Sequence, residues 1–245
     1  MNQVVLVTGS SGGIGQDVVR GLTARGDEVV CADLVAPVSE DGVHFLPLDV
    51  TDESACAAAV ARVRRDYGRL DALIHAAGVL GDTPDPLHTP TTEFERVMRI
   101  NASGTYSMTR EAAQGMLDGG NGGTILLFSS VAAKEARQDY LPYNASKIAI
   151  LQIMWSMAQI LGPSGISVNS VCPGPVNTAM WAQKATNSGA GQKARAARAL
   201  QLPMRRFAEP PEVTSAVLFL TDPANRYLTG VSLDVAGGAH LGVGT

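Results

Sequence analysis

Tyr143 and Lys147 are the two residues of this sequence whose types and spacing are best suited to moving a proton. Residues four apart lie on one face of a helix, about one turn from each other. A phenol alone is too weak an acid at neutral pH, because its unperturbed pKa is about 10. An ammonium group about 4 Å away favours the phenolate by roughly 4 kcal/mol at an effective dielectric constant of about 20, or about three pKa units. We therefore predict that Tyr143 is a general acid and base, although a Tyr-x-x-x-Lys match alone is common on exposed helices.

A glycine-rich turn near the N-terminus is a candidate phosphate site. The β-branched run at residues 4–8 ends in a turn that contains Gly9, Gly13 and Gly15, and an apolar pattern of helical spacing follows up to Gly26. Glycines let the backbone approach an anion, and the N-terminus of the following helix faces it. The spacing is not that of the common G-x-G-x-x-G fingerprint, so an ordinary tight turn between strand and helix is the alternative.

Asp33 ends the next predicted strand, residues 28–33, and lies 18 residues after Gly15. A carboxylate at this place can accept hydrogen bonds from the hydroxyls of an adenosine ribose, and it repels a 2′-phosphate. Residues 34–36 contain no Arg or Lys that would attract such a phosphate. We therefore predict NAD rather than NADP as the cofactor. The alternative is that Asp33 is a solvated turn residue.

The composition excludes several classes of protein. The chain has 245 residues, of which 45% are hydrophobic and 17% charged, so there is material for a core and no disordered tract. The formal net charge is −4 and the longest basic runs are pairs of arginines, which gives little support to nucleic-acid binding. Cys31, Cys56 and Cys172 form neither a metal-spaced pair nor a disulfide framework, which suits a reducing cytoplasm and predicts no metal site.

No segment of the sequence is predicted to enter a membrane. Residues 3–7 begin a strand-like run at once, without the basic start and long apolar segment of a secretory signal. The longest apolar stretch, about residues 148–161, is interrupted by Gln152, Ser156 and Gln159. We expect a soluble, cytoplasmic protein with a small molecule, rather than a membrane or nucleic acid, as its partner.

Predicted strands alternate with helical patterns through the whole chain. The strands are expected at residues 4–8, 28–33, 43–48, 71–75, 124–128, 165–171 and 230–235. This alternation predicts an α/β fold with a doubly wound parallel sheet, as a single domain over residues 1–245. Only residues 34–42 separate the second and third strands, so a loop or a single turn is expected there. Ligands of such sheets bind outside the carboxyl ends of the strands. The segments predicted at those ends are 9–15, 33, 49, 76–78, 130 and 173–178.

Two polar residues occupy places where an apolar side chain is expected. Asn101 lies in the middle of a long helical pattern over about residues 91–116, which indicates a kink or a functional role. His75 ends a predicted buried strand, and imidazole titrates near neutral pH. No acid is patterned beside His75, so we expect it to have a packing role rather than a catalytic one.

Two further segments indicate an assembly and a cover for the site. The helix that carries Tyr143 and continues to Leu161 is apolar almost all round, so one face can cover the sheet while the others need a partner. We expect a homo-oligomer, a dimer or a tetramer, formed through this helix and the long one before it. Residues 179–203 lack firm periodicity, which is typical of a mobile lid. The lid residues that favour a hydrophobic or cyclic alcohol as substrate are Met180, Trp181, Leu200 and Leu202.

With these motifs in this order, the whole chain resembles the short-chain dehydrogenase/reductase family. The family's Thr-Gly-x-x-x-Gly-x-Gly turn corresponds to residues 8–15, its helix asparagine to Asn101 and its serine to Ser130. Its Tyr-x-x-x-Lys pair corresponds to Tyr143 and Lys147. Its Pro-Gly segment corresponds to Pro173-Gly174, and its closing pattern to residues 206–238. Two departures matter. The family's Asn-Asn-Ala-Gly is His-Ala-Ala-Gly at residues 75–78, which leaves open what side-chain contacts brace that turn. The crossover after the second strand is short, so the adenine side of the pocket is expected to be more open.

The resemblance implies a Rossmann-like sheet of about seven strands in the order 3-2-1-4-5-6-7. It also implies that Tyr143 exchanges the hydroxyl proton, that Lys147 lowers the pKa of Tyr143 and holds the nicotinamide ribose, and that Ser130 binds the substrate oxygen. Asn101 would anchor a water that links Lys147 to solvent. The residues implied in dinucleotide binding are Gly9, Ser11, Gly13, Ile14, Gly15, Asp33 (ribose), Asp49 and Val50 (adenine), Ala76, Gly78, Tyr143, Lys147, Pro173, and Val176 and Thr178 (carboxamide).

The function expected from these residues is the NAD-dependent interconversion of a secondary alcohol and its ketone. A 3-oxoacyl-thioester reductase is a second interpretation, which Asp33 disfavours because reductive biosynthesis usually draws on NADPH. A non-catalytic dinucleotide-binding regulator is a third. It is disfavoured because a sensor has no need of Asn101, Ser130, Tyr143 and Lys147 together.

Overall fold

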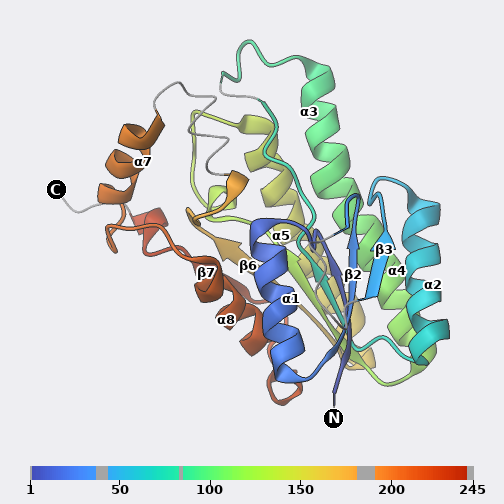
Figure 1. Cartoon of the computed structure of the whole chain (residues 1–245). Coiled ribbons are helices and arrows are strands. Elements are labelled where there is room, and N and C mark those ends of the chain that lie inside the picture. The colour runs from blue at the N-terminus through green and yellow to red at the C-terminus, as the bar shows by residue number, and fades with distance from the viewer. Residues whose placement is uncertain (1, 37–43, 83–84, 181–190, 242–245) are drawn as a thin grey trace.

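A single parallel sheet forms the centre of the molecule (Figure 1). The computed structural model describes residues 2–36, 44–82, 85–180 and 191–241. Seven strands are hydrogen bonded in the order β3-β2-β1-β4-β5-β6-β7, and every neighbouring pair is parallel. They are β1 (Val4–Thr8), β2 (Glu28–Asp33), β3 (His44–Pro47), β4 (Ala72–His75), β5 (Gly123–Phe128), β6 (Ile166–Pro173) and β7 (Ser232–Val235). The predicted fold class and strand order are confirmed.

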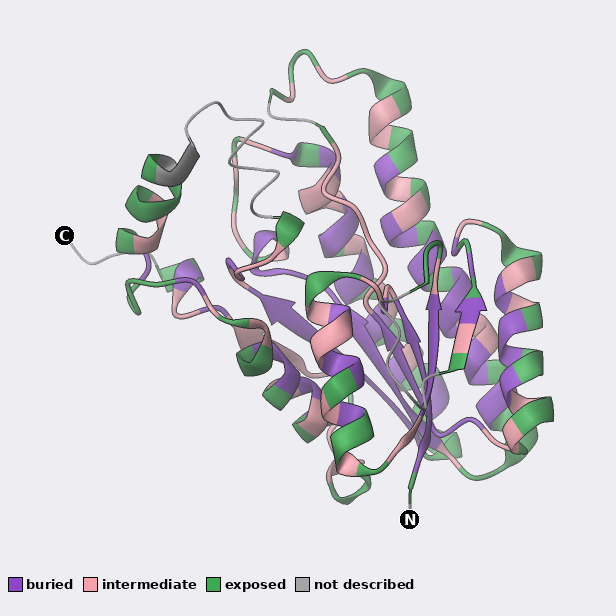
Figure 2. Cartoon of the chain, in the orientation of Figure 1, coloured by how far each residue is buried: buried purple, intermediate pink, exposed green. Residues whose placement is uncertain are grey.

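Helices cover both faces of this sheet. They are α1 (Gly13–Arg25), α2 (Glu53–Tyr67), α3 (Thr91–Met98), α4 (Gly104–Gly119), α5 (Leu141–Leu161), α7 (Gly191–Leu200) and α8 (Pro210–Leu220). α1 packs on α8 on one face, and α2, α4 and α5 lie on the other. Figure 2 shows the central strands buried between these two helical layers, whereas the edge strands β3 and β7 are only partly buried.

Burial on both faces explains the continuous apolar strands. In β1, Val5 and Val7 pack with α1 and α8, whereas Val4 and Leu6 pack in the core beneath α2, α4 and α5. Successive side chains of a strand point to opposite faces, so a strand covered on both sides has no polar alternation. Since the strands are parallel, their carboxyl ends all meet at one edge, where the site is expected.

The long helical pattern around Asn101 is interrupted, as predicted. α3 ends at Met98, the five residues Arg99–Ser103 form a π-helix, and α4 begins at Gly104. A π-helical turn inserts an extra residue into the helix and re-aims the side chains beside it, and such turns are frequent at functional sites. Gly104 allows close packing there, since a Cβ atom at this position would lie 2.8 Å from Val50 Cγ2.

Some predicted boundaries differ from the structure. β4 begins at Ala72, because the carboxylate of Asp71 accepts the backbone N–H of Val4 at 2.8 Å and pairs with Arg69. β6 begins one residue later than predicted and extends to Pro173, and β7 begins at Ser232. Part of the predicted lid, residues 191–200, forms α7, which the weak periodicity did not predict. Residues 181–190 of the lid and residues 37–43 of the short crossover lie outside the described residues.

Candidate active site

Two adjoining pockets lie at the carboxyl edge of the sheet. The smaller contains Ser130, Tyr143 and Lys147, and the larger contains the glycine turn, Asp33 and Asp49. Both are lined by Ile14, Ala76, Gly78, Phe128, Thr178 and Met180, so the two form one continuous site. The structure therefore brings together the two groups of residues that the sequence analysis selected independently.

The turn between β1 and α1 is shaped to let another group approach the backbone. Gly9 has a φ angle of +69°, and a Cβ atom there would lie 2.5 Å from the backbone nitrogen of Ala77. Gly13 begins α1, and a Cβ atom there would lie 3.1 Å from the side chain of Thr178. The first backbone N–H groups of a helix lack internal partners and attract anions. The residues present therefore fit the pyrophosphate of a dinucleotide.

Asp33 and Asp49 line the larger pocket. Asp33 Oδ2 accepts the backbone N–H of Ser11 at 2.9 Å, and Oδ1 accepts that of Leu34 at 2.7 Å. Asp49 Oδ1 accepts two hydrogen bonds from Thr51. Each carboxylate oxygen has a second lone pair, so Asp33 can still accept a bond from a ribose hydroxyl. The backbone bonds fix the orientation of Asp33 toward the pocket.

Two arginines in this larger pocket were not singled out from the sequence. Arg96, on α3, and Arg99, in the π-helix, both line it. Arg96 pairs with Glu93 at 2.6 Å, which neutralises part of its charge. They lie more than sixty residues after Asp33 in the sequence, so only the folded chain shows that they border the same cavity.

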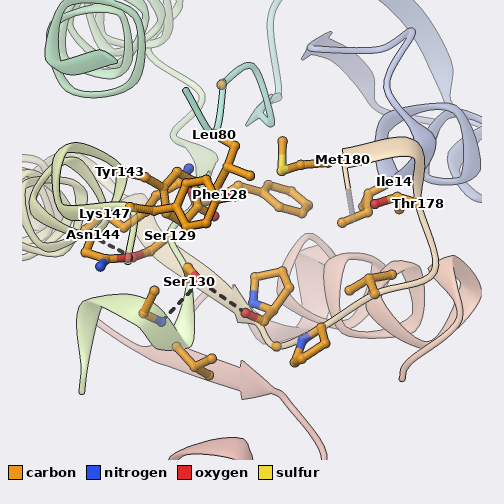
Figure 3. A pocket seen from close by; sticks show the side chains of 18 of the residues that line it. Ile14, Leu80, Phe128, Ser129, Ser130, Tyr143, Asn144, Lys147, Thr178 and Met180 are labelled. Atoms are coloured by element: carbon orange, nitrogen blue, oxygen red, sulfur yellow. Dashed lines mark hydrogen bonds between the residues drawn. The ribbon is translucent and has the colours of Figure 1, made fainter. Parts of the chain in front are cut away.

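Ser130, Tyr143 and Lys147 meet in the smaller pocket (Figure 3). The Lys147 ammonium donates a hydrogen bond to the carbonyl oxygen of Phe128 at 2.8 Å and lies 5.4 Å from the centre of the Tyr143 ring. Burial lowers the pKa of Lys147 to about 8, so it is still mostly protonated at neutral pH. Ser130 Oγ accepts the backbone N–H of Ala132 at 3.1 Å and donates to the carbonyl of Pro173 at 3.4 Å.

The pKa of Tyr143 differs from the prediction. The pKa of the Tyr143 phenol lies above its ordinary value because burial raises it, and a hydrogen bond with Ser130 and the positive charge of Arg137 lower it by less. The lowering of the Tyr143 pKa by Lys147 that the sequence predicts is therefore not seen in this structure. The physical reason is burial, which raises the pKa of the phenol more than the neighbouring groups lower it. The helical spacing predicted which side chains meet, but not how deeply they are buried.

Asn101 braces the site from the π-helix. Its side-chain oxygen accepts the backbone N–H of Val79 at 2.8 Å, and its nitrogen donates to the Val79 carbonyl at 2.8 Å and to Ser146 Oγ at 3.0 Å. Ser146 lies on α5 between Tyr143 and Lys147. Asn101 therefore connects the turn after β4 to α5. That Asn101 anchors a water molecule that links Lys147 to solvent stays a prediction.

His75 has the packing role predicted for it. The ring is 1% exposed, and its Nδ1 atom is 2.8 Å from the hydroxyl of Thr8 on the neighbouring strand. Burial, with a smaller effect of the nearby positive charge of Lys147, lowers the pKa of His75 to about 3. The imidazole is therefore neutral at physiological pH and joins β4 to β1 beside the glycine turn.

The segment after β6 closes the site on its other side. Pro173, Val176 and Thr178 line the smaller pocket. The positioning of a carboxamide by Val176 and Thr178 stays a prediction. Val176 is buried and forms an isolated bridge with Ala208, which ties this segment to the residues before α8. Met180 lines both pockets.

Of the lid residues expected around a hydrophobic substrate, Met180 alone is seen in the site. Leu200 is exposed, Leu202 is buried in the core, and neither lines the two pockets, while Trp181 lies outside the described residues. Pocket residues that sequence reasoning missed include Leu80, Arg137 and Tyr140. The sequence signal that could have pointed to Arg137 and Tyr140 was their position between Ser130 and Tyr143.

Within the described ranges, no three His, Cys, Asp or Glu side chains gather to hold a metal ion, and no helix is long and apolar enough to cross a membrane.

Comparisons with known proteins agree with this architecture. A family model described as enoyl-(acyl carrier protein) reductase matches residues 9–240. The chain is 30% identical over 248 residues to the L-fucose dehydrogenase of Bos taurus, covering 99% of this chain and 91% of that protein. It is 32% identical over 256 residues to the 2-(R)-hydroxypropyl-CoM dehydrogenase of Xanthobacter autotrophicus, covering 99% and 100%. It is 31% identical over 248 residues to the acetoacetyl-CoA reductase of Rhizobium meliloti, covering 98% and 100%.

Solved structures show the same likeness. The ligand-free aldohexose dehydrogenase of Thermoplasma acidophilum superposes with a TM-score of 0.92 at 26% identity, covering 100% of this chain and 96% of that one. ElxO with NADP bound superposes with a TM-score of 0.87 at 27% identity, covering 98% and 99%.

Proposed function

The chain belongs to the short-chain dehydrogenase/reductase family, an NAD(P)-dependent oxidoreductase family that acts on hydroxyl and keto groups, and on that premise we propose that it interconverts a secondary alcohol and its ketone with NAD. One observation carries the proposal. Ser130, Tyr143 and Lys147 line a pocket that is continuous with the one bordered by Asp33 and the glycine turn. This arrangement supports the proposal, because a substrate bound in the first pocket would meet a dinucleotide bound in the second.

Each residue of the triad has a distinct task in this reaction. In the oxidation direction, the Tyr143 phenolate takes the proton of the substrate hydroxyl. Ser130, which hydrogen bonds with Tyr143, holds the substrate oxygen and stabilises the charge that develops on it. Lys147, which lines the same pocket, would hold the ribose of the nicotinamide. A nicotinamide dinucleotide held by the glycine turn and Asp33 would supply the acceptor for the hydride of the carbinol carbon.

The preference for NAD rests on Asp33. Its carboxylate is held toward the larger pocket by two backbone N–H groups, and it would repel a 2′-phosphate there. Arg96 and Arg99 line the same pocket and are the feature most favourable to NADP, but Arg96 is already paired with Glu93. The balance of charges nearest the ribose site therefore favours NAD.

Initial rates with NAD and NADP, at equal low concentration, test the proposal across secondary alcohols, diols and hydroxyacyl thioesters. We expect oxidation of an alcohol with NAD to be the faster reaction. Faster turnover with NADP would contradict the cofactor assignment. Binding of NAD without turnover of any alcohol would instead favour a regulator that only senses the dinucleotide.

A 3-oxoacyl-thioester reductase is the second candidate function. It is supported by the likeness to the acetoacetyl-CoA reductase of Rhizobium meliloti over nearly the whole chain. The same panel separates the two, because this activity predicts that a hydroxyacyl thioester is turned over in preference to the matching free alcohol. Asp33 remains the residue that argues against it.

We also propose a cytoplasmic homo-oligomer, a dimer or a tetramer. The reducing location is supported by Cys31, Cys56 and Cys172, which are all buried free thiols. The assembly is supported by large apolar side chains that stay exposed along α4 and α5, namely Tyr106, Leu117, Ile148, Trp155 and Ile160. Several of these side chains are more than 40% exposed. Exposed apolar patches of this kind usually mark an interaction site.

A further inference from the structure

Arg137 places a positive charge in the wall of the substrate pocket. It lies in the segment between Ser130 and Tyr143, and its side chain is only 16% exposed. The walls around it are largely apolar, including Leu80, Phe128 and Met180. Among the residues described, those that line this pocket include two cations, Arg137 and Lys147, and no Asp or Glu. The pocket therefore has a net positive charge.

The ion-pair partner of Arg137 stands outside this pocket. Glu135 accepts a hydrogen bond from one terminal nitrogen of the guanidinium, yet Glu135 is not among the residues that line the pocket. A guanidinium carries five N–H donors, so one such bond leaves others to satisfy. Its Nε atom is buried and has no hydrogen-bond partner within the described ranges. Glu135 thus orients the guanidinium without facing the substrate.

The positive charge acts at the reacting oxygen. Arg137 lowers the pKa of the Tyr143 phenol, and Glu135 is absent from the charges that affect this pKa. Lys147 donates a hydrogen bond to the Phe128 carbonyl and Arg137 donates one to Glu135. Of these two cations, Arg137 still has a buried donor, Nε, without a partner among the described residues.

We propose that Arg137 binds a carboxylate of the substrate, so that the alcohol oxidised at Tyr143 is a hydroxy acid and the ketone reduced is the matching oxo acid. An arginine binds a carboxylate through two parallel charge-assisted hydrogen bonds, and apolar walls strengthen the attraction. The inference rests on the proposed function. It narrows the class of substrate from the hydrophobic or cyclic alcohols expected from the lid residues to hydroxy acids. The carboxylate itself is unchanged: the hydroxyl proton passes to Tyr143 and the carbinol hydrogen leaves as hydride.

Matched substrate pairs test the charge directly. Initial rates are measured at saturating NAD for lactate, β-hydroxybutyrate and mandelate, each against its methyl ester, with wild type, Arg137→Met and Arg137→Lys. We expect wild type to favour the acid over its ester in kcat/KM by about 30-fold in at least one pair, as a charge-assisted pair provides. Arg137→Met should lose this preference while still oxidising the ester, and Arg137→Lys should keep part of it.

A matched control is Arg62→Met, which removes an arginine from an exposed ion pair with Asp66 on α2. It should leave the ratio of acid to ester unchanged. Equal wild-type rates for acids and esters would overturn the inference and leave the proposed function standing. A ratio of acid to ester in kcat/KM that is unchanged in Arg137→Met would also overturn the inference.

A binding measurement separates a failure of the inference from a failure of the function. If wild type oxidises none of these alcohols, Tyr143→Phe with NAD is titrated calorimetrically with pyruvate, acetoacetate and phenylglyoxylate and with their methyl esters. Tighter binding of an oxo acid that is lost in Arg137→Met supports the inference and counts against the proposed function. Binding that does not depend on Arg137, or no binding, overturns the inference.

Discussion

At the scale of single residues, the chemistry depends on how charges are distributed around one phenol. Burial raises the pKa of Tyr143, and Ser130 and Arg137 lower it. The sequence allowed the prediction that Tyr143 and Lys147 meet, because helical spacing is regular. It could not predict the role of Arg137, because the path of the chain between Ser130 and Tyr143 follows no periodic pattern. That Arg137 lines the same pocket as Tyr143 was therefore visible only in the folded chain.

Asp33 gives a prediction about cofactor choice. Asp33→Asn keeps one side-chain oxygen acceptor but removes the charge that repels a 2′-phosphate. We expect the ratio of kcat/KM for NAD to that for NADP to fall by about tenfold or more, which corresponds to roughly 1.4 kcal/mol. Steady-state rates with both cofactors measure this ratio.

Asp118→Asn is the control for the cofactor experiment. Asp118 is an exposed residue at the end of α4 that pairs with Arg64, and it does not line either pocket. The ratio should not change in this variant. An unaltered ratio in Asp33→Asn would mean that another group selects the cofactor.

His75 gives a prediction about stability in acid. The folded-state pKa of His75 is about 3 and its ordinary value is 6.5, so between these values the unfolded chain binds more protons than the folded one. Stability should therefore fall as the pH drops from about 6.5 toward about 3, by up to roughly 1.4 kcal/mol per pH unit from this residue. His75→Asn, which cannot titrate, should flatten this dependence in urea unfolding measured across the window.

His88→Asn is the matched control for the acid experiment. His88 is 84% exposed and pairs with Asp85 in a loop. Its replacement should change the slope much less than His75→Asn does. If the two variants show the same slope as wild type, His75 is not the buried neutral group that the structure indicates.

At the scale of elements, the π-helix connects the sheet edge to the catalytic helix. A polar residue inside an apolar helical pattern was enough to predict an irregularity at Asn101. The form of the irregularity and its partners were not predictable, because Val79 and Ser146 are 22 and 45 residues away in sequence. The observed strand boundaries differ from the predicted ones by one or two residues for a similar reason. They depend on contacts between residues far apart in sequence, such as the hydrogen bond from the Val4 N–H to the Asp71 carboxylate.

Asn101→Ala tests this brace. The change removes three hydrogen bonds and leaves the backbone groups of Val79 without their partners. We expect the free energy of unfolding to fall by about 2–4 kcal/mol, and kcat to fall because the turn after β4 and α5 lose their connection. Urea unfolding and steady-state kinetics on the same preparations measure both effects.

Asn225→Ala provides the comparison for the brace. Asn225 donates one side-chain bond to the Phe219 carbonyl in an exposed turn after α8. Its loss should cost about 1 kcal/mol or less and leave kcat unchanged. A loss of stability in Asn101→Ala that is no larger would contradict the bracing role.

At the scale of the whole molecule, the fold was the most predictable feature. Apolar strands without alternation require helices on both faces, and parallel strands require crossovers, so the order of elements leaves few possible arrangements. The placement of Arg96 and Arg99 beside the pocket of Asp33 is a consequence of that topology. It could not be predicted from local patterns, because those arginines belong to the crossover between β4 and β5, far along the chain from Asp33.

The exposed apolar face of α4 and α5 gives a prediction about assembly. Trp155→Glu with Ile148→Glu places two charges on this face, where each wild-type side chain is about half exposed. We expect wild type to sediment as a dimer or a tetramer at micromolar concentration and the double variant to sediment as a smaller species, because charges buried in an interface are costly. Sedimentation velocity measures the change.

Leu87→Glu is the control for the assembly experiment. Leu87 is 92% exposed in the segment before α3, outside this face. It should leave the sedimentation coefficient of wild type unchanged. A wild-type chain that sediments only as a monomer would contradict the proposed assembly.

The most direct test of the whole account is the turnover of Tyr143→Phe. This change removes the phenol oxygen while keeping the ring beside Lys147. Because general acid–base catalysis is lost, we expect kcat to fall by about a thousandfold, with NAD affinity and folding preserved. Tyr106→Phe, at an exposed position on α4, should retain wild-type turnover. A Tyr143→Phe enzyme that keeps wild-type turnover would contradict the claim that this phenol moves the proton.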